Sequence, residues 1–356
     1  MSISLTPNTG YGSLDAAIAD ALSTQNTITL LTNQTASGYM APDYAGLGAG
    51  AQSALDLTGQ IGVNSALSAN LNDAGAQMNV AQTALTSIQS ILTNITEALT
   101  LAQSSGTPIA AVAAEAQTAL QQVVAALDTQ YGSIYVFAGQ DRSNPPIPNP
   151  AQITQSAFYA AVQNATGGLA VNGAAAVTTQ VLAAASPGAT SPYSATIEAS
   201  NAPASVSLGG STTLQLGILA DQNSDAVSTG VPATSTGSYM RDILAGLASI
   251  STLNAGDQTA VGFNTFLATL GTSLTNAASA MGTDVAALGS RQNVVTNTQN
   301  ELSDVNTALK SQLSNVQDVD LSQVATQLSE AQTQLQASYQ VISSLSTLSL
   351  AKFLPI

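Results

Sequence analysis

Two interleaved heptad series of mostly apolar residues run along the first third of the chain. The first series is Leu57, Asn64, Leu71, Met78, Leu85, Leu92 and Leu99, and the second is Gln60, Leu67, Ala74, Ala81, Ile88, Ile95 and Ala102. Residues repeated at steps of three and four lie on one face of an α-helix, and a sustained seven-residue repeat is the pattern of a coiled coil. The pattern predicts one continuous helix, on the order of 70 Å long at 1.5 Å per residue.

The end of the chain carries a second apolar seam at the same spacing. Its members are Leu321, Val324, Leu328, Ala331, Leu335, Ser338, Ile342 and Leu345. Asp320 stands where a helix N-cap belongs, and Gln323 three residues later completes a capping box. An apolar helix at a chain end must dock on something to offset the entropy lost on ordering.

Helical patterns recur at both ends of the sequence. Near the N-terminus, Leu14, Ile18, Leu22, Ile28 and Leu31 predict a short helix. We further expect helices at 108–132 and 239–250, and a long helical region from Phe263 to Val316. The seams before and after Asp318-Val-Asp320 are out of step by about two residues, so we expect a break or bend there.

The middle of the chain has a different composition. Residues 134–139 are β-branched and aromatic and predict a short strand, and four prolines follow within 145–150. We expect a helix at 151–164 and short strands at 196–199, 205–208 and 213–219, which together indicate a small β-rich insert. Acidic residues here are expected to be solvated, and 221–225 lacks the spacing of a calcium loop.

These patterns predict a mainly α fold. The N- and C-terminal regions form a long antiparallel coiled-coil or helical-bundle rod, long helix against long helix and terminal helix against terminal helix. We expect three parts: residues 1–45 with 318–356 as terminal helices, 46–140 with 239–317 as the rod, and 141–238 as the insert.

Composition excludes most catalytic chemistry. The chain has no Cys and no His, which removes thiolate ligands and the commonest general base. No Walker loop or dinucleotide fingerprint is present, and 46–50 lacks the preceding strand and following Lys of a phosphate-binding loop. We therefore expect no enzyme activity, no cofactor and no metal.

Charge and hydropathy limit the classes of partner that we expect. Five basic residues against twenty acidic ones give a net charge of -15, which disfavours nucleic acid and anionic lipid. No cleavable signal peptide and no apolar run of about twenty residues is visible, so no membrane insertion is expected. A surface of Ser, Thr, Asn, Gln and Gly suits subunits that pack against copies of themselves.

Three stretches together resemble the flagellin family of bacterial axial proteins and, more closely, its hook-filament junction branch, the hook-associated protein 3 group. The first is Gly132–Pro146, an aromatic-Ala-Gly segment followed by a Pro-bearing exit from the helical region. The second is the end of the chain, with Leu335–Tyr339, Leu348–Leu350 and Phe353-Leu354. The third is Ser37-Gly38 together with Tyr44–Gly48. The resemblance covers about the first 140 and the last 115 residues. The insert resembles no family.

The resemblance implies a structural subunit of the extracellular flagellum, exported without a cleaved signal peptide. Implied partners are copies of itself, other hook-associated proteins, flagellin subunits, the export apparatus and an export chaperone on the C-terminal helix. Filament flagellin is the alternative, and an extracellular binding module that acts through the insert is a second.

The periodic residues of the two terminal helices are the candidate assembly interface. They are Leu14, Ile18, Leu22, Leu321, Leu328, Leu335, Ile342, Leu345 and Leu350. Seams without an internal partner large enough to bury them predict folding coupled to association.

Overall fold

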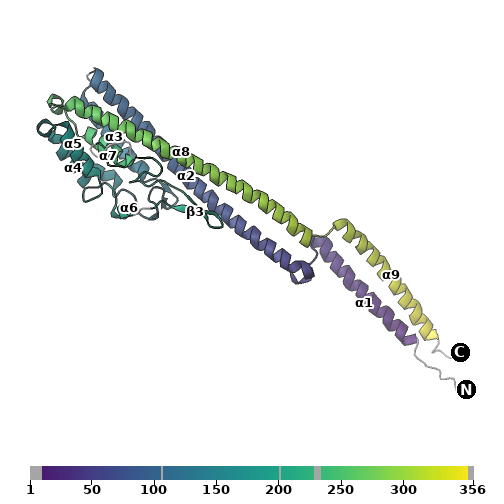
Figure 1. The fold of residues 1–356 in the computed structure, drawn as a ribbon. Helices are drawn as coiled ribbons and strands as arrows, with labels where there is room; N and C mark the ends of the chain where they lie inside the picture. Colours follow the sequence, from purple (N-terminus) through teal and green to yellow (C-terminus); the bar gives the residue numbers. More distant parts are fainter. Residues whose placement is uncertain (1–9, 106, 200–201, 228–233, 352–356) are drawn as a thin grey trace. The chain divides into compact units, whose positions relative to one another are not determined.

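The computed structural model describes residues 10–105, 107–199, 202–227 and 234–351. Helices dominate this part of the chain (Figure 1), which confirms a mainly α fold with a small β-containing region. The chain divides into two compact units. Unit 1 comprises Met1–Ser65 with Ser303–Ile356, and unit 2 comprises Ala66–Leu302.

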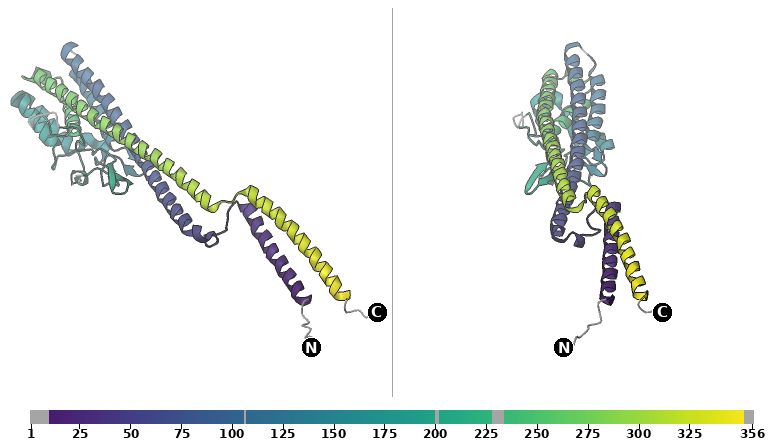
Figure 2. Two further views of the ribbon diagram at one scale, coloured as in Figure 1. Left: turned by 45° about the vertical axis from the view of Figure 1, so that its right-hand side comes forward. Right: turned by 90° about the vertical axis from the view of Figure 1, so that its right-hand side faces the viewer.

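Unit 1 contains the helices from the two ends of the chain. They are α1 (Gly10–Ser37), the 3-10 helix η1 (Ala45–Gly50), the start of α2 (Ala51–Ser105), the end of α8 (Phe263–Gln317) and α9 (Leu321–Ala351). Helices α1 and α9 pack on each other and lie side by side (Figures 1 and 2). The expected pairing of terminal helix with terminal helix is therefore confirmed.

A short antiparallel backbone contact joins the end of α1 to the start of α9. The Met40 amide donates to the Gln317 carbonyl at 2.7 Å, and the Val319 amide donates to the Gly38 carbonyl at 3.0 Å. Gly38 has φ +77°, a left-handed conformation that glycine adopts without strain as the chain leaves α1. The contact separates α8 from α9, so the expected break near Asp318 is also confirmed.

Unit 2 consists mainly of helices around one apolar core. Its other helices are α3 (Ile109–Leu127), η2 (Pro150–Gln155), α4 (Ala157–Gly167), α5 (Leu169–Ala185), α6 (Ala195–Ala199), α7 (Tyr239–Ser251) and η3 (Asp257–Thr259). Buried residues of α2, α3, α4, α5, α7 and α8 belong to a single cluster. Helix α7 lies at its centre, where every residue from Tyr239 to Ile250 is buried against α3, α4 and α5.

The long helices α2 and α8 run antiparallel and side by side (Figure 2). The heptad residues of α2 from Leu71 to Leu99 are buried in the unit 2 core, as are Leu274, Met281, Leu288 and Val295 of α8. The prediction of a continuous heptad helix is confirmed, because α2 spans 55 residues without interruption.

Two small hairpins supply the described β-structure. Strand β1 (Gln130–Tyr131) pairs with β2 (Ile134–Tyr135), and β3 (Ser205–Gly209) pairs with β4 (Thr212–Gln215). In the second hairpin Val206 faces Leu214, and the register shifts between Ser207 and Gly209. The insert is thus more helical than its sequence indicates.

Two expected strands have a different structure, and the strand expected at 213–219 is shorter, because β4 ends at Gln215. Residues 196–199 belong to helix α6, because Ser194 Oγ accepts the Ile197 amide hydrogen and caps the helix while Ile197 packs into the core. The strand expected at 134–139 stops at Tyr135, and Phe137 turns into the core with no exposed surface. Tertiary packing overrides local β-propensity in both segments.

The division into three parts remains a prediction. Side chains of the insert, such as Phe158, Val162 and Val177, share the unit 2 core with α2, α3 and α7. The compact units of the structure therefore follow a different boundary from the composition change at 141.

Candidate assembly surface

Helices α1 and α9 pack through matching lines of residues at heptad spacing. On α9 these are Val324, Leu328, Ala331, Leu335, Ser338, Ile342 and Leu345, and on α1 they are Leu14, Ala17, Ala21, Thr24, Ile28 and Leu31. Ala21, Thr24, Leu31, Val324 and Ala331 are buried, and the others are half-buried. From Val324 to Leu345 the α9 seam expected from the sequence is therefore the face that packs on α1, whereas its first expected member, Leu321, is exposed.

The apolar core of this pair is thin. Leu31, Val324 and Ala331 form its buried cluster, with Ile28, Val319 and Leu328 packed against it. Burial of one large aliphatic side chain contributes about 1.5–3 kcal/mol, and few such side chains are fully buried here. Helices paired by so small a core have little stability of their own.

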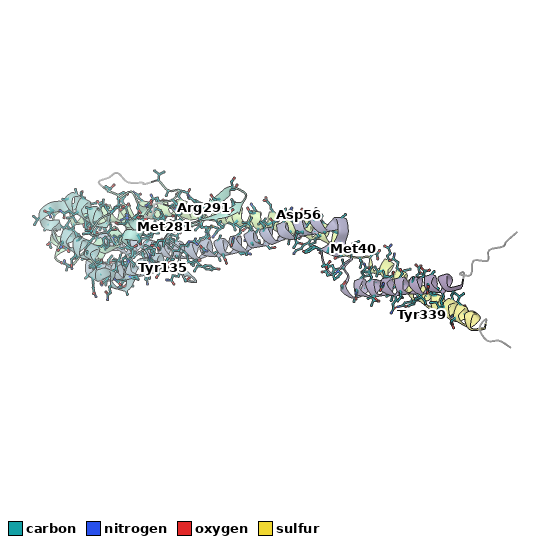
Figure 3. All side chains as sticks on the ribbon, turned by 90° about the horizontal axis from the view of Figure 1, so that it is seen from below. Met40, Asp56, Tyr135, Met281, Arg291 and Tyr339 are labelled. Carbon is teal, nitrogen blue, oxygen red and sulfur yellow. The ribbon has the colours of Figure 1, made fainter. Side chains whose placement is uncertain are left out.

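Large apolar side chains remain exposed on both helices. Ile18 is 41% exposed, Leu22 57% and Leu321 51%, and Tyr339 (Figure 3) and Val341 are also exposed. Single exposed aliphatic residues are normal on any surface. Here the exposed side chains lie on a helix pair that has only a small apolar core. Association with another subunit would therefore bury apolar surface of α1 and α9.

The structure separates the predicted assembly residues into two groups. Leu14, Leu328, Leu335, Ile342 and Leu345 are half-buried, while Ile18, Leu22 and Leu321 are exposed. The side chain of Leu350 lies outside the described residues. Their role in assembly remains a prediction.

Sequence reasoning found Leu14, Ile28 and Leu31 of the α1 line that packs against α9 and missed the other three residues. Ala17, Ala21 and Thr24 are small or polar, so an apolar pattern search selects Ile18 and Leu22 instead. Steps of three and four residues counted from Leu14 would have found the line.

The start of α9 is fixed by two acidic residues. Asp320 Oδ1 accepts the amide hydrogens of Ser322 at 2.9 Å and Gln323 at 3.3 Å, which confirms Asp320 as the N-cap. Asp318 accepts a hydrogen bond from the Ser314 hydroxyl at the end of α8. Both carboxylates therefore serve helix ends rather than acid-base chemistry.

The charges on the described parts of α1 and α9 are all negative. Asp15, Asp20 and Glu330 are exposed, and the described residues of the two helices include no Lys or Arg. Ion pairs cannot hold these two helices together, so their pairing depends on apolar and hydrogen-bonded contacts.

Unit 2 holds a buried cation that the sequence did not reveal. Arg241 of α7 donates to Asp221 Oδ2 at 3.0 Å and to the Ala185 carbonyl at 2.8 Å, and its guanidinium lies 4.8 Å from the Tyr193 ring centroid. Glu198 Oε1 lies 3.4 Å from the same group. The expectation that acidic residues in the insert are solvated is wrong for Asp221, because it neutralises this arginine.

A second buried carboxylate anchors the segment that follows. Asp284 of α8 accepts the amide hydrogens of Ser224, Asp225 and Ala226 at 2.7–2.9 Å and the Tyr239 hydroxyl at 2.9 Å. Asp225 also forms an ion pair with Arg291, and Arg291 is labelled in Figure 3. Each charge has a partner in the fold, so both clusters are structural.

Metal ligands and hollows are the remaining features that could form a site for a small ligand. No group of three potential metal ligands occurs within them. An open hollow of about 330 Å³ beside α8 is lined mainly by Ser and Thr hydroxyls, among them Thr265 and Thr269. Within the same residues no helix is long and apolar enough to span a membrane.

The fold is that of a mainly helical subunit whose two terminal helices pair with each other. Family models identify the class of protein. Residues 12–142 match the bacterial flagellin N-terminal helical region, and residues 272–354 match the bacterial flagellin C-terminal helical region. The two matches together cover more than half of the chain. The chain belongs to the bacterial flagellin family and is a structural component of the extracellular bacterial flagellum.

The chain was also compared with curated proteins and with solved structures. No curated protein matches the sequence. Among solved structures, the chain is similar to a protein from Vibrio parahaemolyticus that is provisionally assigned as flagellar hook-associated, with 11% sequence identity and a TM-score of 0.48. The match covers 74% of this chain and 96% of that one.

Proposed function

We propose that this subunit assembles through its paired terminal helices at the junction between hook and filament. The observation that supports assembly is the α1–α9 pair itself. It joins the two ends of the chain through a thin core and leaves Ile18, Leu22 and Leu321 exposed. Covering such side chains in a polymer contributes about 25 cal/mol per Å² of apolar surface buried.

The junction position rests on sequence resemblance. Gly132–Pro146 and the last residues of the chain resemble the junction branch more closely than filament flagellin. In this proposal the partners are copies of the chain, other hook-associated proteins and flagellin subunits. The export apparatus and an export chaperone bound to α9 are further proposed partners, since α9 has apolar residues that need protection before assembly.

Localisation on intact flagella tests the junction role. Gold-labelled antibody against unit 2 should mark one narrow band where the hook meets the filament, and mass spectrometry should find few copies per flagellum. Label along the entire filament would identify a filament flagellin instead. Absence of the protein from purified flagella would overturn both assignments.

A further inference from the structure

A buried carboxylate lines the open hollow beside α8. The hollow, about 330 Å³ in volume, is bounded by Asp242 of α7, by Thr234 and Ser235, and by one face of α8. Asp242 is only 6% exposed, and burial raises the pKa of its carboxyl. None of the described residues that line the hollow is Lys or Arg. The hollow thus contains a negative charge that no cation in its described lining compensates.

The hydrogen-bond partners of this carboxylate are neutral groups. Asp242 Oδ1 accepts the Thr236 amide hydrogen at 2.7 Å and the Thr236 hydroxyl hydrogen at 2.8 Å, and Oδ2 accepts the Ser235 hydroxyl hydrogen at 2.6 Å. A carboxylate has about four acceptor positions, so Oδ2 keeps one position for a further donor. Hydrogen bonds to a charged donor are stronger than those to a neutral one. A cationic donor would therefore gain most at this position.

Helix α8 contributes further acceptors to the same hollow. Residues at steps of three and four lie on one face of a helix, and those that α8 presents to the hollow include Thr265, Thr269, Thr272 and Asn276. The Thr269 hydroxyl donates to the Thr265 carbonyl at 2.8 Å, and the Thr272 hydroxyl donates to the Ala268 carbonyl at 2.9 Å. Because both hydroxyl hydrogens are used within the helix, the two hydroxyl oxygens are available to a ligand only as acceptors.

We propose that this hollow binds a primary ammonium group, with Asp242 as its counter-ion and Thr269 and Thr272 as hydrogen-bond acceptors. An ammonium group carries three N–H donors and no acceptor, which matches an acceptor lining. A divalent metal ion fits less well, because calcium takes about six to eight oxygen ligands and only one carboxylate lines the hollow. The site belongs to unit 2 alone and does not depend on the proposed assembly.

Two kinds of molecule carry such a group, a small free amine and the lysine side chain of another protein. Methylammonium represents the first, and N-acetyl-lysine methylamide represents the second. Both compounds should bind if the hollow recognises the ammonium group. Tighter binding of the lysine compound would identify a lysine side chain as the ligand, because its methylene groups would then also contact the hollow. Weaker binding of the lysine compound would identify the free amine.

Amide chemical shifts of the full chain, titrated with methylammonium chloride, test the site. A ligand of two non-hydrogen atoms reaches a Kd of roughly 10 mM at best, so the titration extends to about 100 mM at constant ionic strength. Shift changes should concentrate at Ser235, Asp242, Thr269 and Thr272. Tetramethylammonium has the charge without N–H donors, and glycerol has donors without the charge, so neither should shift these amides. Equal shifts with either compound, or with sodium alone, would overturn the proposal.

Substitutions separate ligand binding from the structural role of Asp242. Asp242→Asn keeps an acceptor for Thr236 and removes the charge, so it should weaken methylammonium binding by about tenfold or more. Thr269→Val removes one acceptor at nearly the same shape and should weaken binding about threefold. Thr275→Val is the matched control and should bind normally, because the Thr275 hydroxyl also donates within α8, to the Gly271 carbonyl at 2.8 Å, but does not line the hollow. Unchanged binding by Thr269→Val would overturn the proposal, whatever Asp242→Asn does to the melting temperature.

Discussion

At the scale of single residues, burial of charge sets the electrostatic behaviour of unit 2. Asp128 follows α3, and its Oδ1 accepts the Ile147 amide hydrogen at 3.0 Å while its Oδ2 is enclosed without a partner in the described structure. Burial raises the pKa of Asp128 to about 6, and the Ile147 hydrogen bond offsets part of that rise. The folded protein therefore binds a proton at this carboxyl before the unfolded chain does.

The sign of the linkage follows from this raised pKa. Because the folded pKa of Asp128 exceeds the unfolded value of 3.8, binding a proton at this carboxyl stabilises the folded state. This stabilisation is fully present below about pH 4 and is lost as the pH rises through 6. Burial also raises the pKa of Asp221 and of Asp242, which contribute in the same direction. These three carboxyls together favour the fold at mildly acidic pH.

Replacement of Asp128 by Asn should stabilise the protein at neutral pH. Asp128→Asn keeps an acceptor for Ile147 and removes the buried charge, so unfolding free energy at pH 7.5 should rise by about 1 kcal/mol after allowance for partial exposure. The difference should shrink toward pH 4. Urea titrations at both pH values measure it, with the exposed Asp304→Asn as control. A loss of stability at pH 7.5 would contradict the expectation.

Arg241 should be among the least replaceable residues of unit 2. Arg241→Met leaves Asp221 buried without its partner, and such a change costs about 3–5 kcal/mol. Arg241→Lys keeps the charge but loses the fork that reaches several acceptors, so its cost should be intermediate. Thermal unfolding measures both, and Lys310→Met on the exposed surface should change stability by less than about 0.5 kcal/mol. Similar losses for Arg241→Met and Lys310→Met would contradict the buried-cluster argument.

At the scale of secondary-structure elements, predictability from the sequence depends on how each helix is buried. Helices α2, α8 and α9 have apolar residues at regular heptad spacing, so their existence and pairing follow from the pattern. The packed face of α1 uses Ala and Thr at positions 17, 21 and 24, which an apolar pattern does not reveal. Helix α6 forms because Ser194 caps it and the core receives Ile197, and neither contact is visible in a local window.

The N-cap of α9 offers a test at this scale. Asp320→Ala removes the acceptor for the Ser322 and Gln323 amides and should destabilise the start of α9 by about 1 kcal/mol. Hydrogen exchange of the first turn of α9 should become faster. Asp320→Ser restores a capping oxygen and should recover most of the protection, while equal exchange rates in all three proteins would mean that the cap is unimportant.

At the scale of the whole molecule, the two ends of the chain meet in one helix pair. Its described residues carry negative charges and a thin apolar core, whereas unit 2 has a large continuous core. Backbone hydrogen bonds of helices that pack on a small apolar core open more readily than those around a large one. The subunit thus combines a well-packed unit with terminal helices that gain most from association.

Substitutions at an exposed and at a buried residue of α1 can distinguish polymerisation from pairing of α1 with α9. Leu22→Asp places a charge on the exposed face and should leave α1 and α9 paired in the monomer while polymerisation fails. Leu31→Asp places the charge in the buried cluster and should reduce helicity as well. Circular dichroism and sedimentation measure the two properties. Normal polymerisation by Leu22→Asp would remove this face of α1 from the assembly surface.

The sequence by itself determined the class of fold, the pairing of its ends and the absence of Cys and His chemistry. Heptad spacing and composition are local properties, and they constrain which helix faces must be covered. The tertiary structure decided which acidic residues became buried partners, which stripe of α1 faced α9, and how far the insert joined the core. Those outcomes depend on residues distant in sequence, such as Arg241 with Asp221 and Asp284 with Ser224. Only the assembled core brings such groups within hydrogen-bonding distance.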